Sequence, residues 1–198
     1  MLVRHGVGRC NEAGVIGGRQ GCTGLSEQGR QDSERLAERL AALAAQRPFD
    51  VLLSSPRRRV LECARIVADR LGQPVIVAAG LAGQEFGAAD GRPWHGVTRT
   101  FGGPPTHDPD RPIAHGAESW NDYADRVLTT LGEVLAAHAG RRICVVGHGR
   151  TTALAAALLG GAPDPRVVAP EAAVGHGELT LWRHDAVHWV QERLGAPV

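Results

Sequence analysis

Short apolar runs alternate along this chain with segments of helical periodicity, and this alternation restricts the fold more than any other feature. The apolar runs are residues 2–3, 49–55 (FDVLLSS), 74–78 (PVIVA) and 142–149 (RICVVGHG). Short runs rich in β-branched residues are typical of strands that are covered on both faces. Because helical segments separate them, we expect parallel strands joined by helices on both sides. The prediction is a three-layer α/β/α fold with a mostly parallel central sheet.

Serine residues mark where the helices are expected to begin. Ser26, Ser55 and Ser119 each precede a segment of helical periodicity, and serine is a preferred N-cap. Pro56 is then the first helical residue after Ser55, a position that proline favours. Asp122 stands three residues after Ser119 and gives that helix the form of a capping box.

Two stretches depart from the alternation. Residues 81–116 are rich in glycine and hold five of the 12 prolines. Such a long irregular segment in a compact domain is more typical of a loop that covers a substrate than of a disordered linker. Residues 177–194 alternate in places around the turn-like sequence RHDA and predict a terminal hairpin. The 198 residues are expected to form a single domain, 1–198, with 81–116 as a substrate-covering insertion.

The charge balance argues against polyanionic partners. The formal net charge is +1, from 22 Lys and Arg against 21 Asp and Glu, and no basic stripe is visible. No apolar stretch is long enough to cross a bilayer, and no signal-peptide pattern opens the chain. We therefore expect a cytoplasmic protein that binds a small molecule and neither nucleic acid nor membrane. The oligomeric state stays open, with a homodimer as one option.

The cysteines give no sign of a metal or redox site. None forms a C-x-x-C pair among Cys10, Cys22, Cys63 and Cys144. Neither a zinc site nor a disulfide framework is indicated, and we expect no metal and no cofactor. Cys10 and Cys22 lie near the candidate loops, but we do not expect either to be catalytic. Surface positions on the terminal hairpin are expected for His176, His184 and His188.

Two of the apolar runs lead into the same dipeptide, His-Gly, at residues 5–6 and 148–149. If both strands are central and parallel, His5 and His148 share the crevice at their carboxyl ends, where ligands bind in open α/β sheets. Arg4 precedes the first histidine, and Arg59 opens a helix just past the end of another strand. The helix after Gly149 directs free N–H groups to the same place, which favours an anion. Two arginines, two histidines and a helix N-terminus predict a phosphate site.

The residue types suggest the chemistry. Arginine stays charged and offers a planar fork of donors to phosphate oxygens. A neutral imidazole is a competent nucleophile toward phosphorus, provided that an acceptor holds its other ring nitrogen. We expect Gly6 to let the backbone approach His5 closely enough to supply that acceptor. Arg57 and Arg58 are expected to be solvated residues at a helix start.

The order of these motifs resembles the histidine phosphatase superfamily, with its phosphoglycerate mutase-like fold. The family pattern R-H-G-x-x-x-x-N matches residues 4–11, and its L-[ST]-x-x-G matches LSEQG at residues 25–29. Residues 54–64 are similar to S-x-L-x-R-A-x-x-T-A, which places Arg59 on the family's second phosphate-binding arginine. GAES at residues 116–119 resembles the segment before the late helix.

The resemblance also implies roles for individual residues. His5 would be the phosphorylated nucleophile, with Arg4, Arg59 and His148 around the phosphoryl group. The loop NEAGVIGG…TGLS is similar to the glycine-rich loop of the sugar-bisphosphatase branch. Substrate contacts are therefore expected for Asn11, Thr23, Gly24 and Gly149.

The family's general acid is a glutamate, and this chain has Gly83 at that position. Glu85 would face the same side in extended backbone, displaced by roughly 6.6 Å. We take Glu85 as the expected acid, with Asp90 as the second candidate.

The function that the resemblance implies is metal-independent hydrolysis of a small soluble phosphate ester. Two alternatives remain open at this point. One is phosphoryl transfer of the phosphoglycerate mutase type. The other is a catalytically weak protein that only binds phosphorylated ligands.

Overall fold

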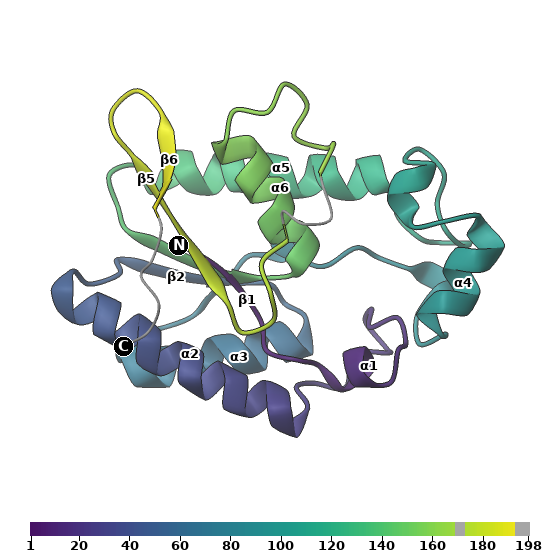
Figure 1. The fold of residues 1–198 in the computed structure, drawn as a ribbon, viewed down its shortest axis with the longest axis horizontal. Helices are drawn as coiled ribbons and strands as arrows, with labels where there is room; N and C mark the ends of the chain where they lie inside the picture. The colour runs from purple at the N-terminus through teal and green to yellow at the C-terminus, as the bar shows by residue number, and fades with distance from the viewer. Residues whose placement is uncertain (169–172, 193–198) are drawn as a thin grey trace.

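The computed structural model describes residues 1–168 and 173–192, and its strands form one sheet in the order β3-β2-β4-β1-β5-β6 (Figure 1). The strands are β1 (Leu2–Arg4), β2 (Val51–Ser54), β3 (Ile76–Val77), β4 (Ile143–Gly147), β5 (Leu179–His184) and β6 (Trp189–Glu192). The first four in that order are parallel, while β5 runs antiparallel to β1 and β6 antiparallel to β5. The predicted sheet and terminal hairpin are confirmed; residues 193 and 194 of the hairpin stretch lie outside the described residues.

Helices cover both faces of this sheet, as Figure 1 shows. They are α1 (Arg9–Glu12), α2 (Glu27–Gln46), α3 (Arg58–Leu71), α4 (Trp94–Phe101), α5 (Trp120–Ala137) and α6 (Gly149–Leu159). Side chains of α2 and α3 pack on one face, and side chains of α5 and α6 pack on the other. The predicted three-layer α/β/α architecture is confirmed. No helix of the described ranges has the length and apolar character needed to cross a membrane.

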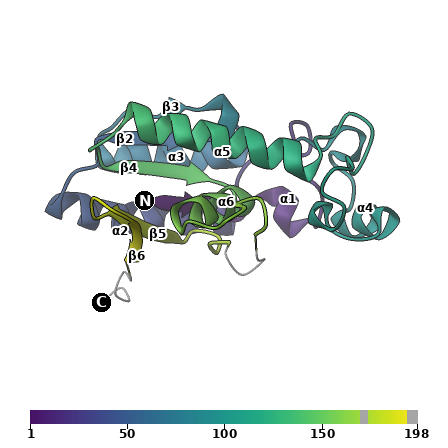
Figure 2. The ribbon, with the colours of Figure 1, turned by 90° about the horizontal axis from the view of Figure 1, so that it is seen from above.

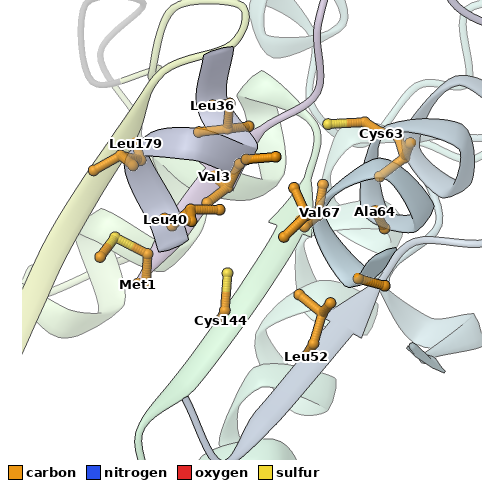
Figure 3. Close-up of a cluster of buried hydrophobic side chains, with 14 of the residues drawn as sticks. Met1, Val3, Leu36, Leu40, Leu52, Cys63, Ala64, Val67, Cys144 and Leu179 are labelled. Carbon is orange, nitrogen blue, oxygen red and sulfur yellow. The ribbon is translucent and has the colours of Figure 1, made fainter. Parts of the chain in front are cut away.

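Two hydrophobic clusters hold the layers together. On the first face, Val3, Leu52 and Cys144 of the strands pack against α2 and α3 (Figure 3). The neighbouring strand residues Leu53 and Val145 point the opposite way and pack against α5 and α6. Successive residues of a strand face opposite sides, so a strand that is covered twice must be apolar at every position. This is why the strands read as continuous apolar runs in the sequence.

Two of the three predicted serine caps are confirmed. Ser26 and Ser119 cap α2 and α5, each accepting a hydrogen bond from a first-turn backbone N–H. The prediction that Ser55 caps the next helix is wrong, because the N-cap of α3 is Arg57. The backbone N–H of Ser55 still bonds to β4, and its hydroxyl lies 2.8 Å from Nε2 of His148. Ser55 therefore follows directly on β2 and still bonds to the sheet, and the helix begins later, at Arg58.

The insertion at residues 81–116 has more regular structure than expected. It contains α4 and the short 3₁₀ turns at Gly87–Ala89 and Pro105–His107. The sequence of α4, WHGVTRTF, holds a glycine and three β-branched residues, all of which are weak helix formers. For this reason the sequence does not predict a helix here. In Figure 2, α1 and α4 lie beyond the carboxyl end of β4. The insertion is therefore placed at the edge of the sheet where the sequence predicts the ligand.

Candidate active site

The pairing of β1 with β4 brings the two His-Gly dipeptides together. Arg4 pairs with Gly147, and the backbone N–H of His5 donates to the Gly147 carbonyl at 3.2 Å. The next residue on each strand is therefore a histidine at the same edge of the sheet. The ring centroids of His5 and His148 lie 5.5 Å apart, and both side chains are buried. The expectation that these histidines share one crevice is confirmed.

The hydrogen bonds of His5 define its tautomer. Its Nδ1 lies 2.5 Å from the Gly6 carbonyl oxygen, which can only accept, so Nδ1 carries the proton. Its Nε2 lies 3.1 Å from Nε of Arg59, which can only donate, so Nε2 presents a lone pair. Burial lowers the pKa of His5 well below its ordinary value, and the nearby Arg59 charge lowers it further. His5 is thus neutral, with its unprotonated nitrogen beside a cation.

Glycine is needed after His5 for a further reason. A Cβ at Gly6 would lie 2.1 Å from the Gly29 carbonyl oxygen in the first turn of α2. A Cβ at Gly29 would in turn lie 1.9 Å from the carbonyl oxygen of Val7. The loop after β1 and the start of α2 therefore approach backbone to backbone. This contact accounts for the glycine of the LSEQG motif.

The guanidinium of Arg59 connects the two histidines. Besides its bond to His5, it donates through Nη2 to Nδ1 of His148 at 3.2 Å. Its Nη1 donates to the carbonyl oxygen of Gly17 at 2.7 Å. All three nitrogens are thus oriented by the protein, and the first turn of α3 places them between the two rings. The sequence-based prediction of a cation at this position is confirmed.

His148 is held by both of its ring nitrogens. Because Nδ1 accepts from Arg59, Nε2 carries the proton and donates to the hydroxyl of Ser55 at 2.8 Å. Burial lowers its pKa well below the ordinary value, and the charge of Arg59 adds to the effect. His148 is also the N-cap of α6, which starts at Gly149. A Cβ at Gly149 would lie 3.0 Å from the guanidinium carbon of Arg4, so glycine keeps that arginine in place.

Arg4 reaches the same site from β1 and has an unused donor. Its Nη1 donates to the carbonyl oxygen of Val174 at 3.0 Å, and its Nη2 donates to Nε2 of His176 at 2.9 Å. Its Nε is buried and has no hydrogen-bond partner among the described residues. A buried donor without a partner is costly, so Arg4 is held in this site at the expense of one unmade hydrogen bond.

His176 does not lie on the surface of the terminal hairpin, and that prediction is wrong. It precedes β5, and its ring centroid lies 5.4 Å from that of His5. Its pKa is lowered to about 4, first by burial and then by the charge of Arg4. The sequence does contain a signal for this position: Gly175-His176-Gly177 repeats the His-Gly pattern that follows the two site strands. His184 and His188 are exposed, as expected.

The side chains of Arg4, His5, Arg59 and His148 line a cavity of about 410 Å³. Its walls come from the ends of β1 and β4, from residues 14–17 and from residues 83, 84, 86 and 94 of the insertion. Asn11 and Gly149, for which the sequence predicts substrate contacts, lie in its lining, and Cys10 lies there as well. Thr23 and Gly24 are not among the described lining residues; their carbonyl oxygens accept hydrogen bonds from Arg9.

The structure does not bring the two candidate acids to this cavity. The Glu85 carboxylate is bound by Arg57 at 2.8 Å and Arg19 at 3.0 Å. Its pKa is lowered: burial, the largest single influence, works in the opposite direction, but the bonds to the two arginines outweigh it. Asp90 accepts backbone N–H bonds from the 18–21 loop. Neither residue is in the described lining, where no aspartate or glutamate occurs. This geometry does not support Glu85 as a proton donor.

Arg57 is not a solvated residue, and the expectation that it would be is wrong. It is only 6% exposed, and besides its ion pair with Glu85 it donates to the Gly83 carbonyl oxygen at 3.2 Å. Arg58, in contrast, is exposed and pairs with Glu62 one turn later in the helix, as a residue at a solvated helix start would. The same sequence run thus supplies one surface arginine, one buried structural arginine and, at Arg59, one arginine of the site.

No group of three His, Cys, Asp or Glu side chains within the described ranges has an arrangement that could hold a metal ion. The charged groups in the cavity lining are arginines, which suit an anion. The arrangement can therefore bind a phosphoryl group by its oxygens and present a neutral imidazole to its phosphorus atom.

Comparisons with known proteins agree with this chemistry. The glucosyl-3-phosphoglycerate phosphatase of Mycolicibacterium vanbaalenii is 34% identical over 175 residues, covering 81% of this chain and 73% of that protein. A metal-independent phosphoserine phosphatase of Arabidopsis thaliana is 32% identical over 154 residues, covering 75% of this chain and 63% of its own length. A solved mycobacterial glucosyl-3-phosphoglycerate phosphatase complexed with VO3 superposes with a TM-score of 0.76 at 25% identity, over 96% of this chain and 95% of that one.

A family model also matches nearly the whole length of the chain. The model of the histidine phosphatase superfamily (branch 1) matches residues 1–196. The matched range includes every side chain of the cavity described above. The chain belongs to the histidine phosphatase superfamily.

Proposed function

We propose that this protein is a phosphomonoesterase that hydrolyses a small phosphate ester through a phosphohistidine on His5. The observation that carries the proposal is the state of His5, whose Nε2 is unprotonated and lies in one cavity with the guanidinium groups of Arg4 and Arg59. The relatives from Mycolicibacterium and Arabidopsis are named as phosphatases of small esters, which supports the same reaction.

The reaction proceeds in two displacements. In the first, Nε of Arg59 gives up its hydrogen bond to Nε2 of His5, the freed lone pair attacks phosphorus, the P–O bond to the alcohol breaks, and the oxygen takes a proton from water. In the second, water attacks the phosphohistidine, the P–N bond breaks, and phosphate leaves with the water's oxygen. His5 then returns to its starting tautomer. The Gly6 carbonyl holds the Nδ1 proton throughout and stabilises the cationic imidazole of the intermediate.

The arginines stabilise charge on the transferring group. Arg4 and Arg59 neutralise its oxygens, and the free N–H groups at the start of α6 add their partial charges. His148 acts as a positioning residue in this scheme, because both of its nitrogens hold neighbouring side chains. Asn11 and Gly149 are proposed to contact the substrate from the cavity wall.

The cell compartment that we propose is the cytoplasm. Its support is the state of the four cysteines, which are buried and free, as is usual for proteins kept in a reducing environment.

The test is hydrolysis of 4-nitrophenyl phosphate by the wild type and by His5→Ala. We expect at least a thousandfold loss in His5→Ala and no change in His184→Ala, which removes an exposed histidine of the hairpin. Acid-labile label from a ³²P ester should appear on the wild type only. Full turnover in His5→Ala would contradict the proposal. Isomer exchange on 3-phosphoglycerate would indicate a mutase, and saturable binding without product would indicate a binding protein.

A further inference from the structure

One cation in the cavity is not used by the reaction above. Arg150 follows Gly149 in the first turn of α6, and its side chain lines the same cavity as His5 and Arg59. Arg150 is half-buried, and no carboxylate among the described residues lies within 4 Å of its guanidinium. A partly buried charge without a counterion is unfavourable, which makes this arginine the feature to explain.

The surroundings of Arg150 fix its position without neutralising its charge. Its Nη1 donates to Oε1 of Gln84 at 2.7 Å, and the amide of Gln84 is itself oriented by a bond to the Glu118 carbonyl oxygen at 3.1 Å. Aromatic rings surround the group, with the guanidinium carbon 5.1 Å from the centroid of Trp94 and 6.0 Å from that of Phe86. Aromatic faces attract a cation but accept no strong hydrogen bond.

Two donor nitrogens therefore remain for a ligand. Nε and Nη2 of Arg150 have no hydrogen-bond acceptor among the described residues, and neither is sealed from solvent. Burial lowers the pKa of Arg150, yet an arginine keeps its charge at neutral pH. In a cavity lined by aromatic rings, a charge–charge contact is screened less than it is in open water.

The charges of the cavity indicate what the ligand carries. Arg4, Arg59 and Arg150 supply three positive charges, the buried histidines are neutral, and the described lining has no acidic side chain. A phosphate ester at neutral pH brings close to two negative charges. One positive charge of the three is not balanced by the phosphate ester. It is the charge of Arg150, the arginine that is not beside His5. A single carboxylate would balance it, whereas a second phosphate would exceed it.

We propose that Arg150 binds a carboxylate of the substrate, so that the enzyme prefers phosphate esters of hydroxy acids to esters of neutral alcohols. This inference rests on the proposed function, because it extends the same site. Gln84 and Trp94 hold the guanidinium so that its free edge faces the cavity, and both come from the insertion. The insertion thus contributes to specificity by positioning a cation.

The test compares ligands that differ at one group. Inhibition constants against 4-nitrophenyl phosphate are measured for 3-phosphoglycerate, for glycerol 1-phosphate, which has CH₂OH in place of the carboxylate, for propane-1,3-diol bisphosphate and for inorganic phosphate. The variants are Arg150→Gln, Arg150→Lys and the control Arg99→Gln, which removes an exposed arginine outside this cavity. A charge-assisted bidentate bond corresponds to about tenfold to a hundredfold in affinity.

The wild type should bind 3-phosphoglycerate at least tenfold more tightly than glycerol 1-phosphate. Arg150→Gln should abolish this difference while leaving inorganic phosphate within twofold, Arg150→Lys should restore part of it, and Arg99→Gln should leave it intact. Equal binding of the two esters by the wild type, tighter binding of the bisphosphate, or equal loss of all ligands in Arg150→Gln would overturn the inference.

Failure of the phosphatase proposal gives a different result. If the wild type does not hydrolyse 4-nitrophenyl phosphate, binding of the same four ligands is measured by titration calorimetry on the same proteins. The carboxylate preference and its loss in Arg150→Gln then still decide the role of Arg150.

Discussion

At the scale of single residues, the cavity combines a neutral nucleophile with fixed cations and no described carboxyl group. His5 owes its unprotonated Nε2 to one backbone carbonyl, because the bond from Nδ1 to Gly6 fixes the tautomer. Arg59 then orients both rings. The described cavity lining has no carboxyl group that could protonate the leaving alcohol, and Gly83 stands at the position where the family resemblance implies a glutamate. A Cβ there would lie 3.1 Å from the ring of His148, so the glycine lets the backbone run against that ring.

The first prediction concerns the leaving group. Without an acid, the rate should depend on how well the alcohol departs unaided, so aryl esters should turn over at least about a hundredfold faster than alkyl esters. Glu85→Gln should change both rates by the same small factor, because the Glu85 carboxylate is bound to Arg57 and Arg19. Measuring kcat for 4-nitrophenyl phosphate and for glycerol 1-phosphate checks this. A loss in Glu85→Gln confined to the alkyl ester would instead identify Glu85 as the acid.

At the scale of elements, the site depends on how β1, its following loop and α2 fit together. The parallel register of β1 and β4 sets His5 beside His148, and the bare backbones of Gly6 and Gly29 let α2 approach the loop that carries the nucleophile. The contact between these two backbones therefore fixes the positions of β1, the loop that follows it and the start of α2 relative to one another. This contact is formed by glycines because any side chain would occupy the space of the opposing carbonyl group.

A prediction at this scale uses two glycines in helices. Gly29→Ala should destabilise the protein by about 2–4 kcal/mol, because its Cβ would meet the Val7 carbonyl oxygen at 1.9 Å. It should also lower kcat, because the loop holding His5 must shift. Gly132→Ala in α5 is the control, because nothing lies within 4 Å of its Cβ; it should stabilise by about 0.5–1 kcal/mol. Urea unfolding and nitrophenyl phosphate turnover measure both variants. Equal stabilities would show that the close approach of α2 is not required.

At the scale of the whole molecule, the site gathers charge at one edge of a nearly neutral protein. Three histidines there, His5, His148 and His176, have pKa values lowered by burial and by arginines. Each binds fewer protons in the folded state than in the unfolded chain, so the free energy of unfolding rises with pH. The stabilisation is complete above the unfolded pKa near 6.5 and is lost as pH falls below it, down to the folded value of about 4 for His176.

We therefore predict a marked loss of stability between pH 7.5 and 5.5. Each neutral buried histidine contributes about 1.4 kcal/mol per pH unit below 6.5, so the three together should lower the free energy of unfolding by roughly 3–4 kcal/mol. His176→Asn should show a smaller decrease, and His184→Asn, at an exposed position, should match the wild type. Urea unfolding at the two pH values is the measurement. A free energy of unfolding that stays constant over this range would contradict the histidine assignment.

The sequence by itself determined the fold class and the centre of the site. Apolar periodicity, serine caps and strand ends are local properties, and parallel pairing then brings the ends of two central strands to one edge. For that reason the placement of His5, His148 and Arg59 in one site could be predicted from the sequence alone. The start of α3 and the helix in the insertion could not, because Ser55 bonds to a distant histidine and α4 is built from weak helix formers.

Only the tertiary structure decided which charged side chains are neutralised by an ion pair and which keep an unpaired charge. Arg57, Glu85, Arg150 and His176 lie in segments that the sequence separates by tens of residues, and their roles depend on which partner each one meets. Arg57 and Glu85 neutralise one another, whereas Arg150 meets an amide and aromatic rings and keeps its charge facing the cavity. No local pattern encodes such a pairing, because it follows from how the insertion packs over the carboxyl ends of the strands.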